Sequence, residues 1–218
     1  MSPATTLCAL AIAGVFLHFA PAQARAADAM TSGAWDCALR AGALRERLEA
    51  VTEAVIDGRA AAVPAAAESA QAWWRLHGAT FAGHADAASQ ISQLVNAARS
   101  RHALEAAHLS VQLSAETLGW CPGELSIADR LMVADLVGMA AWLRARGVAT
   151  AEPGNSRAVM DSIGAALLRA HHAGLAARLH AAYAAVHPLR RMTGGKPSDA
   201  RAAVGLLGLV DEIEKVLH

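Results

Sequence analysis

The chain has 218 residues, and its 19 basic and 19 acidic side chains give a net charge of zero. Its only lysines are Lys196 and Lys215, so the basic surface that contacts a nucleic-acid backbone is not predicted. Hydrophobic residues make up 55% of the chain but aromatic residues only 4%, because much of the apolar content is alanine, the strongest helix former. No run rich in β-branched and aromatic residues reads as a strand, so the composition predicts an all-α protein.

An apolar, uncharged segment near the start of the chain predicts export. Residues 7–17 read LCALAIAGVFL, and a small-x-small cleavage pattern follows at residues 22–24 and again at residues 24–26. We predict a signal peptide over residues 1–26, cut after Ala24 or Ala26. Because no Lys or Arg precedes the apolar run, an uncleaved membrane anchor is the alternative. The mature chain is expected in the periplasm or outside the cell, with no stable membrane span after cleavage.

Two cysteines remain after the predicted cleavage, Cys37 and Cys121. An even pair in an oxidising compartment predicts a disulfide, and a pair of free buried thiols is the alternative. The chain contains no Cys-x-x-Cys-His sequence, which excludes covalent attachment of a c-type haem.

Three helices are predicted in the first half of the chain. The first covers residues 35–57 and ends at Gly58, a typical C-terminal glycine. The second starts at Pro64, which suits a first helical turn, and is expected to run to about residue 99 with kinks at its glycines. The third covers residues 101–118 and stops at the Gly-Trp-Cys-Pro-Gly sequence that follows.

The predicted disulfide depends on a break in the chain near Ser100. At a rise of about 1.5 Å per residue, a single unbroken helix over residues 64–118 would hold the two cysteines far apart. A turn near Ser100 lets the third helix run back along the second and brings Cys121 toward Cys37. A disulfide requires the two Cα atoms to lie within about 7 Å of each other.

Three further helices complete the expected bundle. The fourth is capped by Ser126 with Asp129 and runs to about residue 145. The fifth covers residues 156–187 and stops before Pro188, and the last begins near Ser198. The sequence therefore predicts an antiparallel bundle of five or six helices, forming a single domain over residues 27–218.

Three histidines and a methionine are predicted to face the core of this bundle. On the second helix, His77 and His84 fall in the same apolar stripe, and His171 does so on the fifth helix. Met139 points inward from the fourth. Imidazole and thioether groups bind copper, other transition metals and b-type haem, so these four residues are the candidate metal ligands. The alternative is that each is a structural core residue with a protein hydrogen-bond partner.

Two other local patterns favour a structural role over metal binding or catalysis. Glu105 and His108 form a Glu-x-x-His sequence, but a ferritin-like di-metal site needs two such motifs and the chain has only one. Trp73 and Trp74 point about 100° apart on a helix, so both can be buried only if that helix is covered on two sides. Otherwise Trp74 marks a ligand groove or a partner surface.

No catalytic motif is visible. The chain has no His-Glu-x-x-His, Gly-x-Ser-x-Gly or glycine-rich phosphate loop, so we do not predict an enzyme. The sequence predicts an exported helical bundle that acts by binding, by docking to a protein partner or supporting an envelope complex. The alternative function is a small-ligand module that binds copper, another transition metal or haem b.

Overall fold

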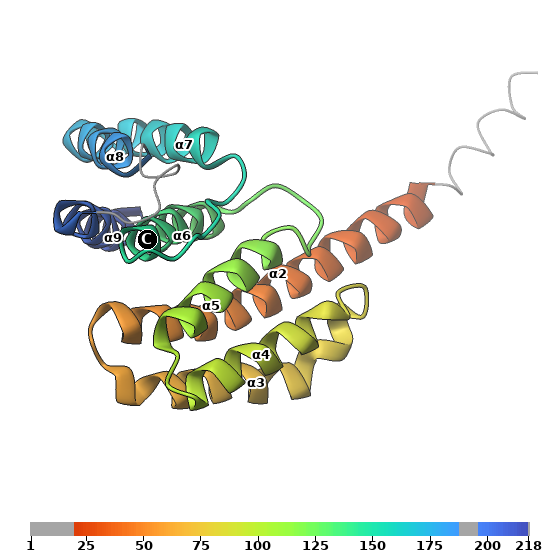
Figure 1. Cartoon of the computed structure of the whole chain (residues 1–218). Coiled ribbons are helices and arrows are strands. Elements are labelled where there is room, and N and C mark those ends of the chain that lie inside the picture. The colour runs from red at the N-terminus through yellow and green to blue at the C-terminus, as the bar shows by residue number, and fades with distance from the viewer. Residues whose placement is uncertain (1–19, 188–195, 218) are drawn as a thin grey trace, which may run out of the picture.

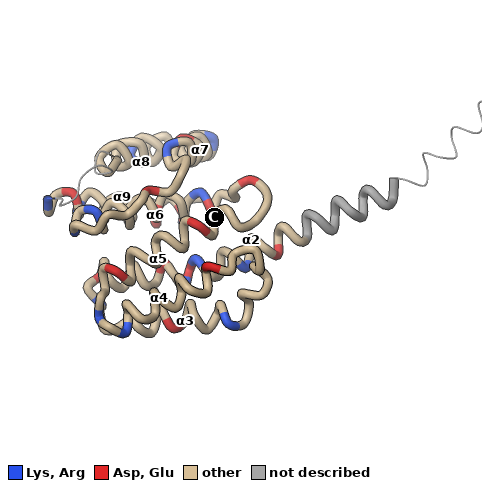
Figure 2. Tube along the Cα trace, turned by 45° about the vertical axis from the view of Figure 1, so that its right-hand side comes forward, with Lys and Arg blue, Asp and Glu red and all other residues tan. Residues whose placement is uncertain are grey.

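The computed structural model describes residues 20–187 and 196–217, with side chains described from Gly33 onward. These residues form eight α-helices, two short 3-10 segments and no strand, so the predicted all-α class is confirmed. Figure 1 shows that the helices form two groups, α2 to α5 and α6 to α9. Basic and acidic positions alternate over both groups in Figure 2, which agrees with the zero net charge.

The first group is a ring of four helices, each beside two others. Its members are α2 (Ala20–Ile56), α3 (Val63–His77), α4 (Asp86–Arg99) and α5 (Ala103–Thr117), with the 3-10 segments η1 (Ala60–Ala62) and η2 (Gly78–Phe81) between them. Leucine and β-branched side chains from α2, α4 and α5 fill the centre. The fully buried ones include Leu44, Leu48, Ile91, Leu94 and Leu113.

The second group repeats this plan with α6 (Ile127–Ala145), α7 (Ser156–Arg169), α8 (Ala173–Val186) and α9 (Pro197–Leu217). Its core includes Leu136, Leu143, Met160, Ile163, Leu167, Leu179 and Leu206. α6 and α9 pack closely, because a Cβ atom added at Gly138 would lie only 2.8 Å from the Leu207 side chain. Each group thus buries its own apolar core.

Polar contacts join the two groups. Arg45 on α2 forms a buried ion pair with Asp129 on α6 and donates to the carbonyl of Thr117 at the end of α5. Asp129 also forms the predicted capping box with Ser126 at the start of α6. Farther along, His108 on α5 hydrogen-bonds Thr150 in the loop after α6, with 3.0 Å between Nδ1 and Oγ1.

Two predicted long helices are each divided into a hairpin, so the number of helices exceeds the five or six expected. The predicted helix over residues 64–99 ends at His77 and restarts at Asp86. Gly78 follows the end of α3 and packs directly on the Trp74 indole, since an added Cβ would lie 2.6 Å from that ring. Its backbone is still helical, with φ of −59°, and α4 starts only after the 3-10 segment η2.

The predicted helix over residues 156–187 is divided at His171. This residue has a left-handed backbone, with φ of 64°, and the next N–H, that of His172, donates to the carbonyl of Leu167 at 2.8 Å. The α4–α5 turn uses the same arrangement, with φ of 61° at Arg101 and a bond from His102 N–H back five residues at 2.9 Å. Both are helix endings of the Schellman type, built without glycine at the left-handed position.

The disulfide between Cys37 and Cys121 is present, with 5.8 Å between the Cα atoms and a sequence separation of 84. The predicted turn near Ser100 exists, but the chain returns to the level of Cys37 through three turns between helices instead of two. α2 begins well before the predicted residue 35 and extends past the other helices of its group (Figure 1).

Residues 1–19 of the predicted signal peptide lie outside the described part of the chain. Among the described residues, no helix is both long enough and apolar enough to cross a membrane.

Candidate functional site

His77 and His84 both belong to an aromatic cluster at one end of the first helix group. The cluster consists of these histidines with Trp73, Trp74, Phe81 and Trp120. The His84 ring stacks on Trp120, with 4.7 Å between ring centroids and 15° between planes. The His77 ring lies 4.8 Å from that of Trp73. Both imidazoles are half-buried, and each uses a ring face for packing.

The tryptophan pair lies in the same cluster and is covered from two sides, as the core interpretation of the sequence requires. Trp73 is buried and contacts Phe81, with 6.3 Å between ring centroids. Trp74 is half-buried and contacts Trp120 edge-on at 5.8 Å. The cluster therefore closes the end of the bundle beside the disulfide, where Trp120 precedes Cys121.

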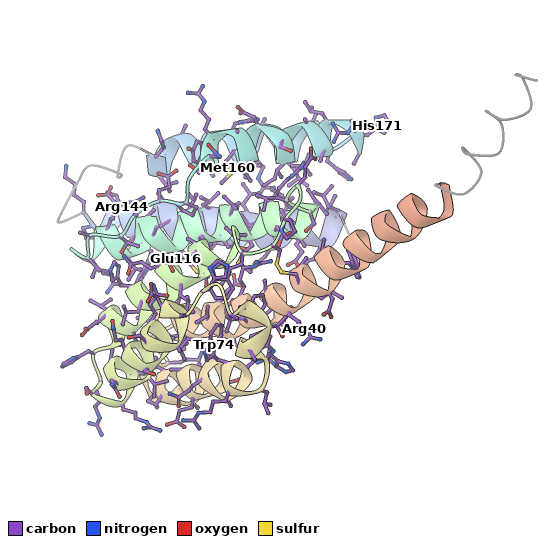
Figure 3. All side chains as sticks on the ribbon, turned by 90° about the vertical axis from the view of Figure 1, so that its right-hand side faces the viewer. Arg40, Trp74, Glu116, Arg144, Met160 and His171 are labelled. Carbon is purple, nitrogen blue, oxygen red and sulfur yellow. A yellow bond between two sulfur atoms is a disulfide. The ribbon has the colours of Figure 1, made fainter. Side chains whose placement is uncertain are left out.

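The four candidate metal ligands are not brought together. Met139 faces inward as predicted, but it is buried in the core of the second group. The prediction that His171 faces a core is wrong: it is exposed at the α7–α8 turn, because its left-handed backbone ends α7 there. Figure 3 shows His171 at the outer edge of the molecule, far from Trp74.

Binding of a metal ion or a haem by any one of these four residues stays a prediction. Among the described residues, no three His, Cys, Asp or Glu side chains are grouped so that they could hold one metal ion. In the Glu105-x-x-His108 sequence, the exposed Glu105 pairs with His102, with 3.3 Å between Glu105 Oε2 and His102 Nδ1. Burial lowers the pKa of His108, which favours the neutral imidazole that hydrogen-bonds Thr150.

A buried polar network in the second group was not predicted. Glu152 has a fully buried side chain whose Oε1 atom accepts hydrogen bonds from Ser156 and from the Tyr183 hydroxyl, the latter at 3.2 Å. His187 completes the network, with Nδ1 3.2 Å from the Tyr183 hydroxyl and 3.6 Å from Glu152 Oε2. The network fixes the loop before α7 to the end of α8. Its members are spread along the sequence, so no local sequence pattern predicted the network.

A cluster of carboxylates lies where α2, α6 and α9 meet. Its members are Glu49, Glu53, Asp135, Asp211 and Glu214. Burial, followed by the charge of Glu53 and the other acidic neighbours, raises the pKa of Glu49 to about 7. Burial and the same neighbours raise the pKa of Asp135 well above its usual value. Burial and like charges in this arrangement oppose the ionised form of Glu49 and of Asp135.

The cluster makes stability depend on pH. The native state keeps a proton on Glu49 that the unfolded chain, with an ordinary pKa of 4.5, has already lost. Stability should therefore fall as pH rises from about 4.5 to about 7.

We expect Glu49→Gln to raise the free energy of unfolding at pH 8 by about 2 kcal/mol, and to flatten the pH dependence of urea unfolding. Glu124→Gln, which changes an exposed carboxyl in the loop before α6, is the control. An equal gain from both variants would show that the cluster is not responsible.

The most exposed aromatic side chain described is on α2. Trp35 is 67% exposed, and Leu39, one helical turn later, is 58% exposed. We call these two residues the docking ridge. The disulfide through Cys37 lies about 160° around the helix from Leu39, so the ridge points away from the bundle.

The backbone under the docking ridge is fixed from other sides of α2. Arg40 pairs with Asp36 at 3.0 Å and donates to the hydroxyl of Thr80 in η2 at 3.3 Å. Cys37 is tied to Cys121. The ridge is thus a pair of apolar side chains on an anchored segment, at the place where α2 leaves the bundle (Figure 1).

Comparisons of the chain with protein-family models, with curated proteins and with solved structures found no match.

Proposed function

We propose that the chain is an exported binding protein, and not an enzyme, that docks to a protein partner through the docking ridge of Trp35 and Leu39. The observation that carries the proposal is the 67% exposure of Trp35 beside a 58% exposed leucine. Tryptophan is the residue type most enriched at the energetic centres of protein interfaces. Its large ring gives much buried area for few lost rotamers.

Anchoring of the ridge supports the proposal. A side chain held on a rigid helix loses less conformational freedom on binding than one on a mobile loop. The disulfide and the contacts of Arg40 provide that rigidity. The disulfide, together with the apolar start of the sequence, supports an oxidising compartment outside the cytosol.

Site-specific crosslinking in the cells that make the protein tests the proposal. A photo-reactive amino acid replaces Leu39 in one variant and Leu168 in a second. Leu168 is a matched control because it is 57% exposed, on α7 in the other helix group. We expect a discrete adduct with a second protein from position 39 and none from position 168.

The crosslink should depend on the tryptophan. A Trp35→Ala change at an interface centre weakens binding by about 2 kcal/mol, or roughly thirtyfold. The adduct from position 39 should therefore be lost in the Trp35→Ala background. Identical adducts from both positions, or an adduct that survives Trp35→Ala, would refute docking at the ridge.

A further inference from the structure

A second candidate site lies at the seam between the two helix groups, away from the docking ridge. Here the end of α2, the end of α6 and the start of α9 enclose an open groove of about 520 Å³. Pockets that bind small organic molecules typically have volumes of about 300–1,000 Å³ and often lie between domains or helices. The groove therefore has the size and the position of a small-molecule site.

The groove has an apolar wall. Ile56 from α2 is half-buried, Trp142 from α6 is a buried residue that lines the groove, and Val204 from α9 is 47% exposed. Alanines from α6 and α9 complete the wall. Contact with a ligand would remove the Val204 and Ile56 surfaces from water, which favours an apolar ligand body.

Two arginines give the groove its charge. Arg146 and Arg201 both line it, and within the described residues neither forms an ion pair with a carboxylate. The Arg146 guanidinium carbon lies 4.6 Å from the centre of the Trp142 ring. Stacking on the indole holds this cation in place and leaves its N–H groups available to an anion.

The nearest carboxylates in sequence have partners of their own. Asp57 pairs with Arg59 at 2.8 Å. Asp199 accepts a hydrogen bond from the backbone N–H of Lys196 at 2.7 Å. Neither carboxylate therefore forms a direct ion pair with Arg146 or Arg201.

The distribution of charge along the seam also determines which end of it attracts an anion. The acidic cluster lies on the same three helices, seven residues from the groove on each: Glu49 to Ile56, Asp135 to Trp142, and Val204 to Asp211. Seven residues of helix span about 10 Å. An anionic group is thus attracted to the arginine end of the seam and repelled from the other end.

We infer that the groove binds a small organic anion with an apolar body, whose charged group contacts Arg146 and Arg201 while its chain lies against Trp142, Ile56 and Val204. Decanoate is a probe with this chemistry. Decanol and decylamine have the same chain with a neutral or a positive head, so the three compounds separate apolar contact from charge recognition.

Calorimetric titration of the full chain with each probe tests the inference. Decanoate should bind at least about tenfold more tightly than decanol, since a charge-assisted contact to arginine is worth that factor or more. Decylamine should bind more weakly than decanol. Equal binding of all three compounds would overturn the inference.

Variants assign the binding to this groove. Arg146→Gln and Arg201→Gln should each weaken decanoate binding about tenfold and leave decanol binding unchanged. Both arginines are exposed, so the fold should tolerate the changes. Arg169→Gln, on the exposed end of α7, is the matched control and should have no effect. Unchanged affinity in both groove variants would place the site elsewhere.

The inference does not rest on the proposed docking function. Trp35→Ala should leave decanoate affinity unchanged, and Arg201→Gln should leave the crosslink from position 39 unchanged. Loss of one activity without the other in this pair of variants separates the two sites.

Discussion

Replacing both cysteines by serine should lower the free energy of unfolding by about 3–4 kcal/mol. The bond between Cys37 and Cys121 closes a loop with a sequence separation of 84 residues. In the unfolded chain, a closed loop of this length removes many conformations, and opening it restores them. The disulfide is expected to be the largest single contribution to stability in the first helix group.

Urea unfolding followed by circular dichroism measures this loss. Treatment of the natural chain with a thiol reductant should give the same decrease as Cys37→Ser/Cys121→Ser. The double variant itself should not respond to the reductant. A midpoint that stays the same after reduction would show that the bond does not stabilise the native state.

The disulfide should also affect docking. It fixes α2 to the segment after α5 at the base of the docking ridge. Without it, the segment that carries Trp35 gains freedom, which must be lost again on binding. The crosslink from position 39 should therefore weaken in the serine variant under conditions in which the rest of the chain stays folded.

Arg45→Met should lower the free energy of unfolding by about 3 kcal/mol. The Arg45 side chain is 6% exposed and that of its partner Asp129 is 16% exposed. Burial lowers the pKa of the Arg45 guanidinium, and the charge of Asp129 opposes that shift. Removal of the cation leaves a mostly buried carboxylate without its counter-charge and the Thr117 carbonyl without this donor.

A double-mutant cycle measures the interaction between Arg45 and Asp129 separately from the other contacts of each residue. Asp129→Asn keeps the shape of the side chain at the start of α6 but removes its charge. If the ion pair is responsible, Arg45→Met/Asp129→Asn should be at least about 1 kcal/mol more stable than the sum of the single effects predicts. Additive losses would mean that each residue acts alone.

The fold class and the disulfide were predictable because each depends on a strong, local signal. Alanine-rich sequence favours helix throughout, and the two cysteines that lie outside the predicted signal peptide leave one pairing. The Ser126–Asp129 capping box was predictable for the same reason, since its spacing fixes its geometry.

The division of residues 156–187 was missed because its left-handed position is His171 and not a glycine. A weaker signal was present in the apolar pattern. On one continuous helix, the stripe of Ile163 and Leu167 and the stripe of Leu179 and Tyr183 would point roughly 160° apart. A helix that packs on one core cannot bury both stripes, so the change of face indicated a turn near His171.

The groove and the buried Glu152 network depend on tertiary contacts between segments that are distant in sequence. Arg146 and Arg201 are separated by two helices and a loop, and no spacing rule connects them. The error at His171 has a local origin instead, because its place in a stripe was counted along a helix that ends just before it.

The mass of the protein isolated from its own cells under non-denaturing conditions tests docking through Trp35 and Leu39 most directly. Light scattering should give a complex with a second protein for the natural chain and for the control Leu168→Ser. The variant Trp35→Ala/Leu39→Ser should give the free chain. The same mass for all three proteins would contradict the proposed docking ridge.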